Sequence, residues 1–196
     1  MYRRILRSFL SFSAAVVALS ACSAPDSVTP DQQSGASFSR AAEPSTNSSL
    51  ESLRRVTARF QRFEAAIAAG YETKVTPCWA HHSAGAMGYH YGKMDLFDAN
   101  VDLLAPEVVM YEPQPGGQLK LVGMEYIVPI DAWGGAGHDV NDPNDRPELL
   151  GQKFTQHSSL PIFKLHIWLW RDNPQGTYAD WNPMVSCDAA ADKEIF

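Results

Sequence analysis

The sequence predicts an α+β fold, a single domain in which one long amphipathic N-terminal helix packs on a mainly antiparallel sheet. Three observations favour this fold class. Apolar residues recur at helical spacing between residues 53 and 67, and strand-like alternation occupies residues 107–128 and 162–170. The turn-forming segment 114–118 divides the first of these alternating stretches, which is typical of an antiparallel hairpin.

The predicted helix begins at a capping box formed by Ser48 and Glu51, whose side chains can each bond an unpaired backbone amide. One apolar stripe follows at spacings of three and four residues, and arginines occupy the opposite face. Its members are Leu53, Val56, Phe60, Phe63 and Ile67. Gly70 suits the left-handed conformation that ends many helices. Such a stripe is usually the side that packs on a sheet.

The segments after Gly70 are shorter. Residues 80–92 contain three glycines within eight positions, which predicts a glycine-rich loop and no regular helix. Strands are expected at 107–113, 119–128, 162–170 and near 184–187, with a turn at 173–176 and a long irregular loop at 131–152.

Composition limits the function classes. The 196 residues include 45% hydrophobic and 19% charged residues, as expected of a globular chain. The net charge of −6 argues against nucleic-acid binding, which normally needs a basic face. No apolar run reaches the roughly 18 residues that a membrane-spanning helix requires.

The first 22 residues have the layout of a bacterial lipoprotein signal. Three arginines precede a short apolar run, and residues 19–22 read Leu-Ser-Ala-Cys. The pattern resembles a lipobox, in which the cysteine, here Cys22, is acylated and becomes the mature N-terminus. The alternatives are an ordinary signal peptide with an incidental cysteine, or a buried helix. The expected organisation is a signal peptide at 1–21, the lipidated cysteine and a flexible tether at 22–48, and one globular domain at 49–196.

Removal of the signal peptide changes the net charge of the chain and indicates where the mature protein is located. The three arginines are lost, which leaves 13 basic and 22 acidic residues and a net charge of −9. Anionic lipid repels such a chain, so the acyl groups on Cys22 must supply the anchor. We therefore expect the protein to lie in the cell envelope, anchored by its lipid. Ser23 after the cysteine favours the outer membrane, facing the periplasm or the cell surface, if the host is Gram-negative.

Two cysteines remain for the domain. Cys78 and Cys187 form an even pair in an oxidising compartment, which predicts a disulfide. A thiolate metal ligand or nucleophile is the alternative, although the pair lacks CxxC spacing.

The histidines supply the candidate site. His166 alternates with core residues in its strand and lies between large aromatic residues, and Glu125 is a carboxylate within an apolar strand. His90 lies in the glycine-rich segment, where a flexible loop can approach a ligand. Together these residues form a two-histidine, one-carboxylate set that suits a divalent transition metal with open coordination positions. Tyr91, Trp168 and Trp170 are expected to line the pocket.

Two alternatives stay open for this set. A buried strand histidine is often a hydrogen-bonded core residue, and a strand glutamate can face solvent. His81 or His82 could supply a further ligand.

Several segments also resemble a group of uncharacterised bacterial secreted proteins and lipoproteins. They read GYHY at 88–91, LHIWLW at 165–170 and WNPMVSC at 181–187. The resemblance spans most of residues 53–187. It implies a single extracytoplasmic bacterial domain and indicates no particular activity.

Three functions are compatible with these observations. The chain is expected to be a membrane-anchored envelope lipoprotein whose domain binds a small ligand or a divalent metal. It could instead be a metal-dependent enzyme that uses two histidines and one glutamate, or an interaction module that holds another envelope protein. The expected partners are the membrane, through the lipid on Cys22, and a small molecule or an envelope protein.

Overall fold

The computed structural model describes residues 45–196, and the predicted signal peptide, Cys22 and most of the predicted tether lie outside this range. Its elements, in chain order, are α1 (Thr46–Thr57), the 3-10 helix η1 (Ala58–Gln61), α2 (Phe63–Ala68), β1 (Thr73–Lys74), β2 (Cys78–His81), β3 (Gly85–Gly92), the 3-10 helix η2 (Met94–Leu96), β4 (Val108–Pro113), β5 (Leu119–Pro129), α3 (Ile130–Gly135), β6 (Glu148–Leu149), β7 (Gln152–Lys153), β8 (Thr155–Gln156), β9 (Ile162–Ile167) and β10 (Lys193–Ile195). Within this range no helix is long and apolar enough to cross a bilayer.

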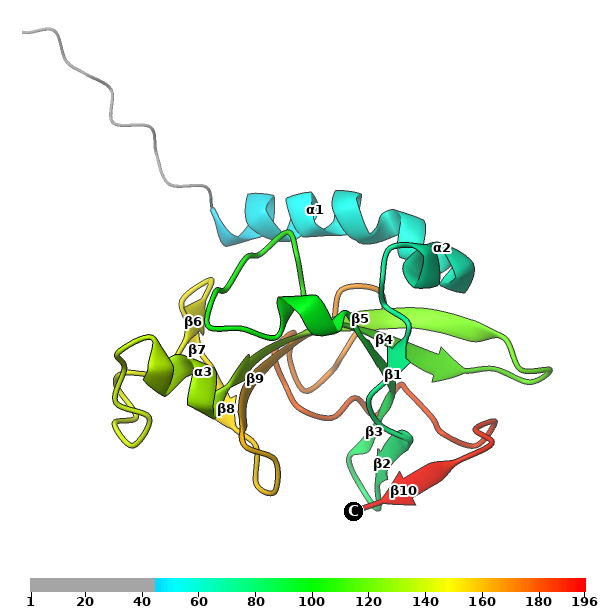
Figure 1. Ribbon diagram of the computed structural model, residues 1–196. Helices are drawn as coiled ribbons and strands as arrows, with labels where there is room; N and C mark the ends of the chain where they lie inside the picture. Colours follow the sequence, from blue (N-terminus) through cyan, green and yellow to red (C-terminus); the bar gives the residue numbers. More distant parts are fainter. Residues whose placement is uncertain (1–44) are drawn as a thin grey trace, which may run out of the picture. The chain divides into compact units, whose positions relative to one another are not determined.

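The predicted fold class is wrong, because most of the fold is a curled mixed sheet that forms a half-barrel. The strand order is β10-β2-β3-β4-β5-β9-β8, with β1 paired to β3. β10 runs parallel to β2, whereas the other neighbouring strands are antiparallel. Figure 1 shows the two sides of the sheet bending away from the helices.

The long helix expected over residues 48–69 is also wrong. Helix α1 begins at Thr46, where the side chain of Ser45 accepts a hydrogen bond from the Ser48 amide, so the predicted capping box is not the start. The chain leaves helical geometry at Arg62, whose ψ is 114°. There the Tyr111 hydroxyl of the sheet donates to the Phe60 carbonyl at 2.7 Å, which satisfies a backbone acceptor at the break.

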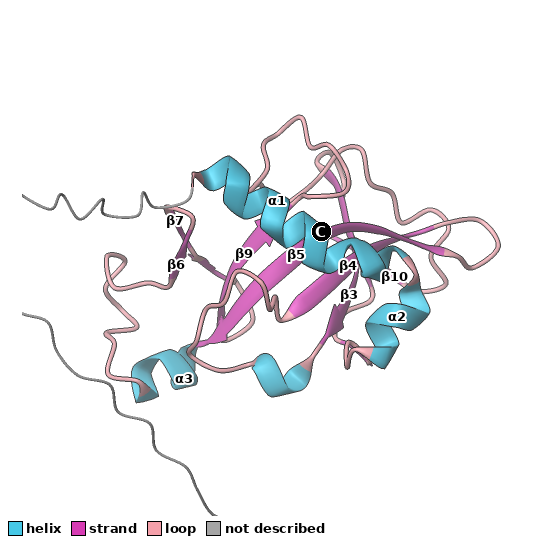
Figure 2. Ribbon diagram, turned by 90° about the horizontal axis from the view of Figure 1, so that it is seen from above, coloured by secondary structure: helices cyan, strands magenta, loops and turns pink. Residues whose placement is uncertain are grey.

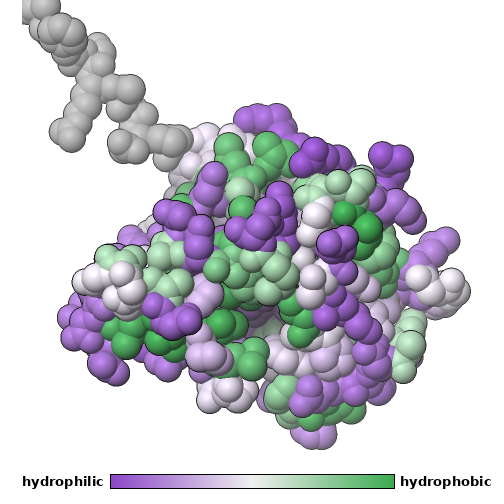
Figure 3. Space-filling model, viewed as in Figure 1, coloured by the Kyte–Doolittle hydropathy of each residue, from purple (hydrophilic) through white to green (hydrophobic). Residues whose placement is uncertain are grey.

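The helical layer still covers one face of the sheet, as its apolar stripe predicts. Figure 2 shows α1 lying across the central strands. Leu53 and Phe60 pack there with sheet residues such as Val109, Tyr126 and Leu165. Val56, a predicted member of the stripe, is instead 39% exposed. At the top of Figure 3, the outward side of this layer carries hydrophilic residues with some hydrophobic ones among them.

A second core occupies the face turned away from α1. Its buried members include Val108, Met110, Ile127 and Trp168, together with both cysteines. This face is the inner side of the curl, and it also carries the buried polar residues of the candidate site. Two separate cores therefore stabilise the sheet, one on each face.

The hairpin β4–β5 and strand β9 confirm the corresponding sequence predictions. In contrast, the glycine-rich segment is strand β3 and not a loop, and the expected 131–152 loop contains α3 and the small hairpin β6–β7. No strand forms at 184–187. The chain there is joined to β3 through an isolated bridge between Ala86 and Asn182, and β10 supplies the last strand instead.

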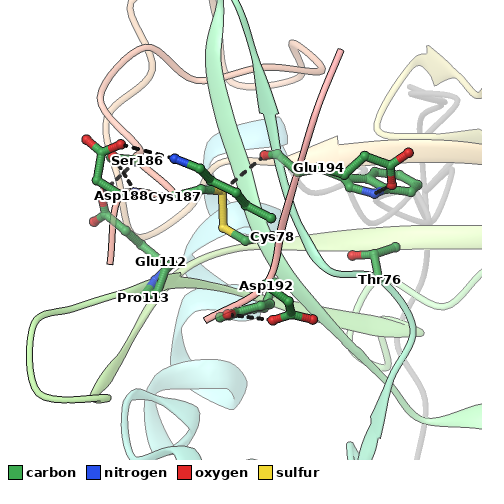
Figure 4. The surroundings of a disulfide bond; sticks show 12 residues. Thr76, Cys78, Glu112, Pro113, Ser186, Cys187, Asp188, Asp192 and Glu194 are labelled. Atoms are coloured by element: carbon green, nitrogen blue, oxygen red, sulfur yellow. Dashed lines mark hydrogen bonds and ion pairs between the residues drawn. A yellow bond between two sulfur atoms is a disulfide. The ribbon is translucent and has the colours of Figure 1, made fainter. Parts of the chain in front are cut away.

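The predicted disulfide is confirmed. Cys78 and Cys187 are bonded, with their Cα atoms 5.8 Å apart, across a sequence separation of 109 residues. The bond joins β2 to the segment that leads into β10, and nearby Glu112 accepts a hydrogen bond from the Ser186 amide at 3.0 Å (Figure 4). This arrangement fixes one side of the half-barrel.

A candidate metal centre inside the half-barrel

Three strands bring the predicted residues together: His90 lies on β3, Glu125 on β5 and His166 on β9. Glu125 and His166 are direct partners across the β5–β9 ladder. His90 lies two strands from Glu125, with β4 between them. Their side chains meet because the sheet is curled, so that residues on its inner face converge. Each of the three offers a ligand atom within 4.8 Å of the others.

Alternation along the strands explains why Glu125 and His166 face inward. Glu125 lies between Met124 and Tyr126, and both neighbours belong to the core under the helices. His166 likewise lies between Leu165 and Ile167 of that core. Because successive side chains in a strand point to opposite faces, the polar residues must point into the curl.

Gly88 explains why His90 is on a strand, where a loop was expected. Its φ is +86°, and a Cβ atom there would lie 2.4 Å from the Tyr111 carbonyl oxygen of β4. Only glycine permits both the positive φ and this close approach. The glycine therefore allows β3 to pair with β4, and that pairing holds His90 opposite Met110.

The three polar groups are close but do not form good hydrogen bonds with one another. His90 Nε2 lies 3.6 Å from Glu125 Oε2, and His166 Nε2 lies 3.4 Å from Glu125 Oε1. Nitrogen–oxygen hydrogen bonds are usually near 2.9 Å. A tetrahedral ion with ligands at ~2.1 Å separates its ligand atoms by about 3.4 Å, which is close to both distances.

The far nitrogen of each ring has a polar atom beside it, but only that of His90 lies at hydrogen-bond distance. Thr76 Oγ1 lies 2.8 Å from His90 Nδ1, and Asp180 Oδ1 lies 3.4 Å from His166 Nδ1. The second distance is too long for a well-formed hydrogen bond, so we regard it as an electrostatic contact. Such hydroxyl and carboxylate partners orient histidines that bind metal through the opposite nitrogen. Both partners therefore leave the Nε2 atoms facing Glu125.

The Nε2 atoms of both histidines are buried and, within the described part of the chain, have no hydrogen-bond partner. The side chains of His90, Glu125 and His166 are 1%, 7% and 0% exposed. Within residues 45–196, neither Nε2 atom has a hydrogen-bond partner. A buried polar atom without a partner typically costs about 1–3 kcal/mol. The donor set therefore fits a bound cation, which would occupy both lone pairs and compensate the buried carboxylate.

Electrostatics favour the neutral form of one ligand. Burial, followed by the nearby His166 and Lys164, lowers the pKa of His90 well below its ordinary value, so this imidazole stays neutral. Burial raises the pKa of Glu125, although His166 and Lys164 oppose that change. His166 and Lys164 hold the pKa of Asp180 well below its usual range.

Only one of the three predicted pocket residues lies beside this group. The Trp168 ring is 6.2 Å from the His166 ring, with an interplanar angle of 23°. Tyr91 instead packs edge-on against Phe63 of the helical layer, 4.7 Å between ring centroids. Tyr91 directly follows His90 in β3, so its side chain points to the opposite face of the sheet.

Trp170 is likewise outside the predicted pocket. Its Nε1 atom donates to Thr57 Oγ1 of α1 at 3.3 Å. Strand β9 ends at Ile167, so the alternation assumed for Trp170 does not extend that far. His81 and His82 do not join the group either. His81 Nδ1 accepts backbone hydrogen bonds from Ser83 and Ala84 in its own turn.

A cleft that sequence reasoning missed lies beside the group. Its volume is about 190 Å³. Its lining residues come from distant parts of the chain: Trp79, Met87, Gln156, His157, Ser158, Lys164, Asp180, Trp181 and Phe196. No local motif joins these positions, so only the LHIWLW segment near Lys164 gave any signal. A larger cleft of about 700 Å³ includes Tyr89 and Tyr91 but none of the three candidate ligands.

No protein family, curated protein or solved structure matches this chain. The geometry defines a half-barrel with a buried His-Glu-His group that could hold a metal ion.

Proposed function

We propose that this protein is a bacterial envelope lipoprotein whose domain binds one divalent transition-metal ion through His90, Glu125 and His166. The observation that carries the metal assignment is the convergence of the three ligand atoms within 4.8 Å, inside the protein. Both imidazoles direct Nε2 towards the carboxylate, His90 Nδ1 lies at hydrogen-bond distance from Thr76, and His166 Nδ1 has a longer contact with Asp180. This is the arrangement expected of metal-binding histidines.

The alternative of a hydrogen-bonded core cluster explains the distances less well. Such a cluster would bring nitrogen and oxygen to about 2.7–3.2 Å. The separations of 3.4 and 3.6 Å leave both nitrogens unsatisfied at a buried position. A divalent ion accounts for the spacing and the charge together.

Two imidazoles and one carboxylate leave at least one coordination position for another ligand. Structural zinc sites usually have four protein ligands, whereas catalytic sites often have three and an open position. The same donor set also suits iron(II) with open positions. The cleft beside Lys164 and Asp180 favours a metal-dependent enzyme as the second candidate, since it offers room for a reactant.

The metal proposal predicts that the full-length protein, stripped with a chelator in detergent, binds one equivalent of zinc. Affinity should fall as the pH is lowered, because a proton at Glu125, whose pKa is raised by burial, competes with the metal. Titration against a chromophoric chelator at several pH values measures both effects. Absence of stoichiometric zinc binding at neutral pH would refute the proposal.

The lipoprotein proposal rests on the signal-like N-terminal pattern that ends at Cys22. We expect the protein to label with a fatty-acid probe and to sediment with membranes. The Cys22→Ser variant should lose the label, because no other residue supplies the acylated thiol. Serine at the neighbouring position, as in Ala21→Ser, is the matched control and should keep it. Persistent labelling of Cys22→Ser would contradict the proposal.

A further inference from the structure

The outward side of the helical layer carries a cluster of arginines, which we call the arginine face. Its four members are exposed and occur within nine residues of α1, η1 and the break that follows: Arg54, Arg55, Arg59 and Arg62. Within residues 45–196, none of them forms an ion pair with a carboxylate. Their positive charges are therefore not neutralised by the part of the chain that the structure describes.

Neutral groups hold two of these side chains in place. Arg54 donates a hydrogen bond to the Leu169 carbonyl at 3.0 Å. Arg59 lies over the Phe60 ring, with its guanidinium carbon 4.8 Å from the ring centroid. Such contacts position a guanidinium group without compensating its charge. An anionic partner is therefore what the arginine face lacks.

Charge is distributed unevenly over the domain. Residues 46–69, which form the helical layer, include four arginines and two glutamates and have a net charge of +2. Residues 71–196 include eight basic and 17 acidic residues and have a net charge of −9. An anionic surface would attract the first part and repel the second. Such a surface would therefore orient the domain with its helical layer facing the negative charges.

Small apolar side chains lie among these arginines. Val56 is 39% exposed and directly follows Arg55 in α1. An open cleft of about 380 Å³ combines charged residues with three alanines, and its lining consists of Arg59, Arg62, Glu64, Ala65, Ala68 and Ala69. Positive charge beside exposed apolar groups suits the boundary of a bilayer, where anionic headgroups meet hydrocarbon.

The chain enters the domain at the helical layer. The lipid expected on Cys22 would be joined to Thr46, where α1 begins, by 23 residues. Even at full extension a segment of this length spans at most about 80 Å. The anchor therefore keeps a bilayer within reach of the arginine face, and the resulting high effective concentration allows weak contacts to suffice.

We propose that the arginine face docks on the anionic phospholipid surface of the membrane that holds the lipid anchor. This inference rests on the lipoprotein function proposed above and not on the metal. The arginine face orients the domain and does not replace the anchor, because the mature chain as a whole is negatively charged. Docking leaves the His-Glu-His group on the side of the sheet that is turned away from the bilayer.

The test places a nitroxide on the arginine face of the full-length, lipidated protein. Ala58→Cys supplies the attachment point at an exposed position among the arginines. The protein is reconstituted into vesicles of phosphatidylcholine alone, or of two parts phosphatidylcholine to one part phosphatidylglycerol. Collisions of the nitroxide with a neutral, water-soluble relaxation agent should be several-fold less frequent on the anionic vesicles, because docking covers the label.

A second label position serves as the control for accessibility. The turn between β8 and β9 lies at the opposite end of the domain from α1 (Figure 1). Ser158 is an exposed residue of this turn. A nitroxide attached through Ser158→Cys should therefore remain equally accessible on both kinds of vesicle.

Charge variants separate the arginine face from the net charge of the protein. Accessibility of the Ala58 label on anionic vesicles should rise to its neutral-vesicle value when three arginines are replaced together, Arg55→Gln, Arg59→Gln and Arg62→Gln. The matched control removes the same charge at exposed lysines of β5, β7 and β10 and should keep the protection: Lys120→Gln, Lys153→Gln and Lys193→Gln. Salt at about 1 M, where the Debye length is about 3 Å, should also remove the protection.

The outcomes distinguish this proposal from the one on which it rests. If phosphatidylcholine vesicles do not retain the protein, the lipid anchor is refuted and the docking proposal with it. If the protein is retained but the Ala58 label is equally accessible on both kinds of vesicle, the anchor stands and the docking assignment is wrong. Equal effects of the arginine and lysine variants would also overturn the assignment.

Discussion

Replacement of His166 by alanine is expected to lower zinc affinity by more than about 100-fold, because loss of an outer partner alone typically costs 10–100-fold. His166 is fully buried and lies 3.4 Å from the carboxylate that would share the ion. His90→Ala should have an effect of the same order. Competition with a chromophoric chelator measures the affinities.

Two further variants separate ligand loss from misfolding. Glu125→Gln keeps the shape of the side chain but removes its charge, so it should weaken zinc binding while the protein remains folded. His82→Ala removes an exposed histidine outside the group and is the matched control, with unchanged affinity expected. Wild-type affinity in a folded His166→Ala variant would show that this residue is not a ligand.

Removal of the disulfide is expected to cause the largest loss of stability. The Cys78–Cys187 bond spans 109 residues, for which the chain-entropy model gives about 4–5 kcal/mol. Both cysteines are buried, so the double variant Cys78→Ala/Cys187→Ala tests the bond without adding polar groups to the core. Urea unfolding of this variant and of the wild type measures the difference.

The matched control for that experiment is Cys22→Ser, which leaves the domain disulfide intact and should not change the free energy of unfolding. A loss of less than about 1 kcal/mol in the double variant would contradict the expected role of the cross-link, given the usual range of 2–4 kcal/mol.

Local patterns predicted a substantial part of the fold. The alternation over 162–167 correctly separated the inward His166 from the core residues Leu165 and Ile167. The turn at 114–118 correctly placed the hairpin β4–β5. These features depend on neighbouring residues in the chain, so sequence periodicity reports them directly.

Features that depend on distant contacts were missed. The apolar stripe indicates which face of the helix packs on the sheet, but it does not predict the break at Arg62. The Tyr111 hydroxyl of the sheet donates a hydrogen bond to the Phe60 carbonyl beside this break. The glycines at 85–92 indicated a loop, whereas the close approach to β4 at Gly88 makes this segment a strand. Likewise, β10 is a strand because it pairs with β2, and its three residues carry no strong pattern.

The candidate site was predictable for a physical reason that did not require the fold. A carboxylate within an apolar strand and a histidine between core residues each need a buried partner. That need identified Glu125 and His166, and their direct pairing across β5 and β9 satisfies it. The surrounding cleft could not be found this way, since Trp79, His157 and Phe196 become neighbours only when the sheet curls.

X-ray absorption at the zinc edge of the zinc-loaded, full-length protein tests the metal assignment most directly. The site proposed here predicts nitrogen and oxygen neighbours at about 2.0–2.2 Å and the outer-shell signature of two imidazoles. Glu125→Gln and His166→Ala should each alter that spectrum. A shell with sulfur at ~2.3 Å, or one without imidazole scattering, would contradict coordination by His90, Glu125 and His166.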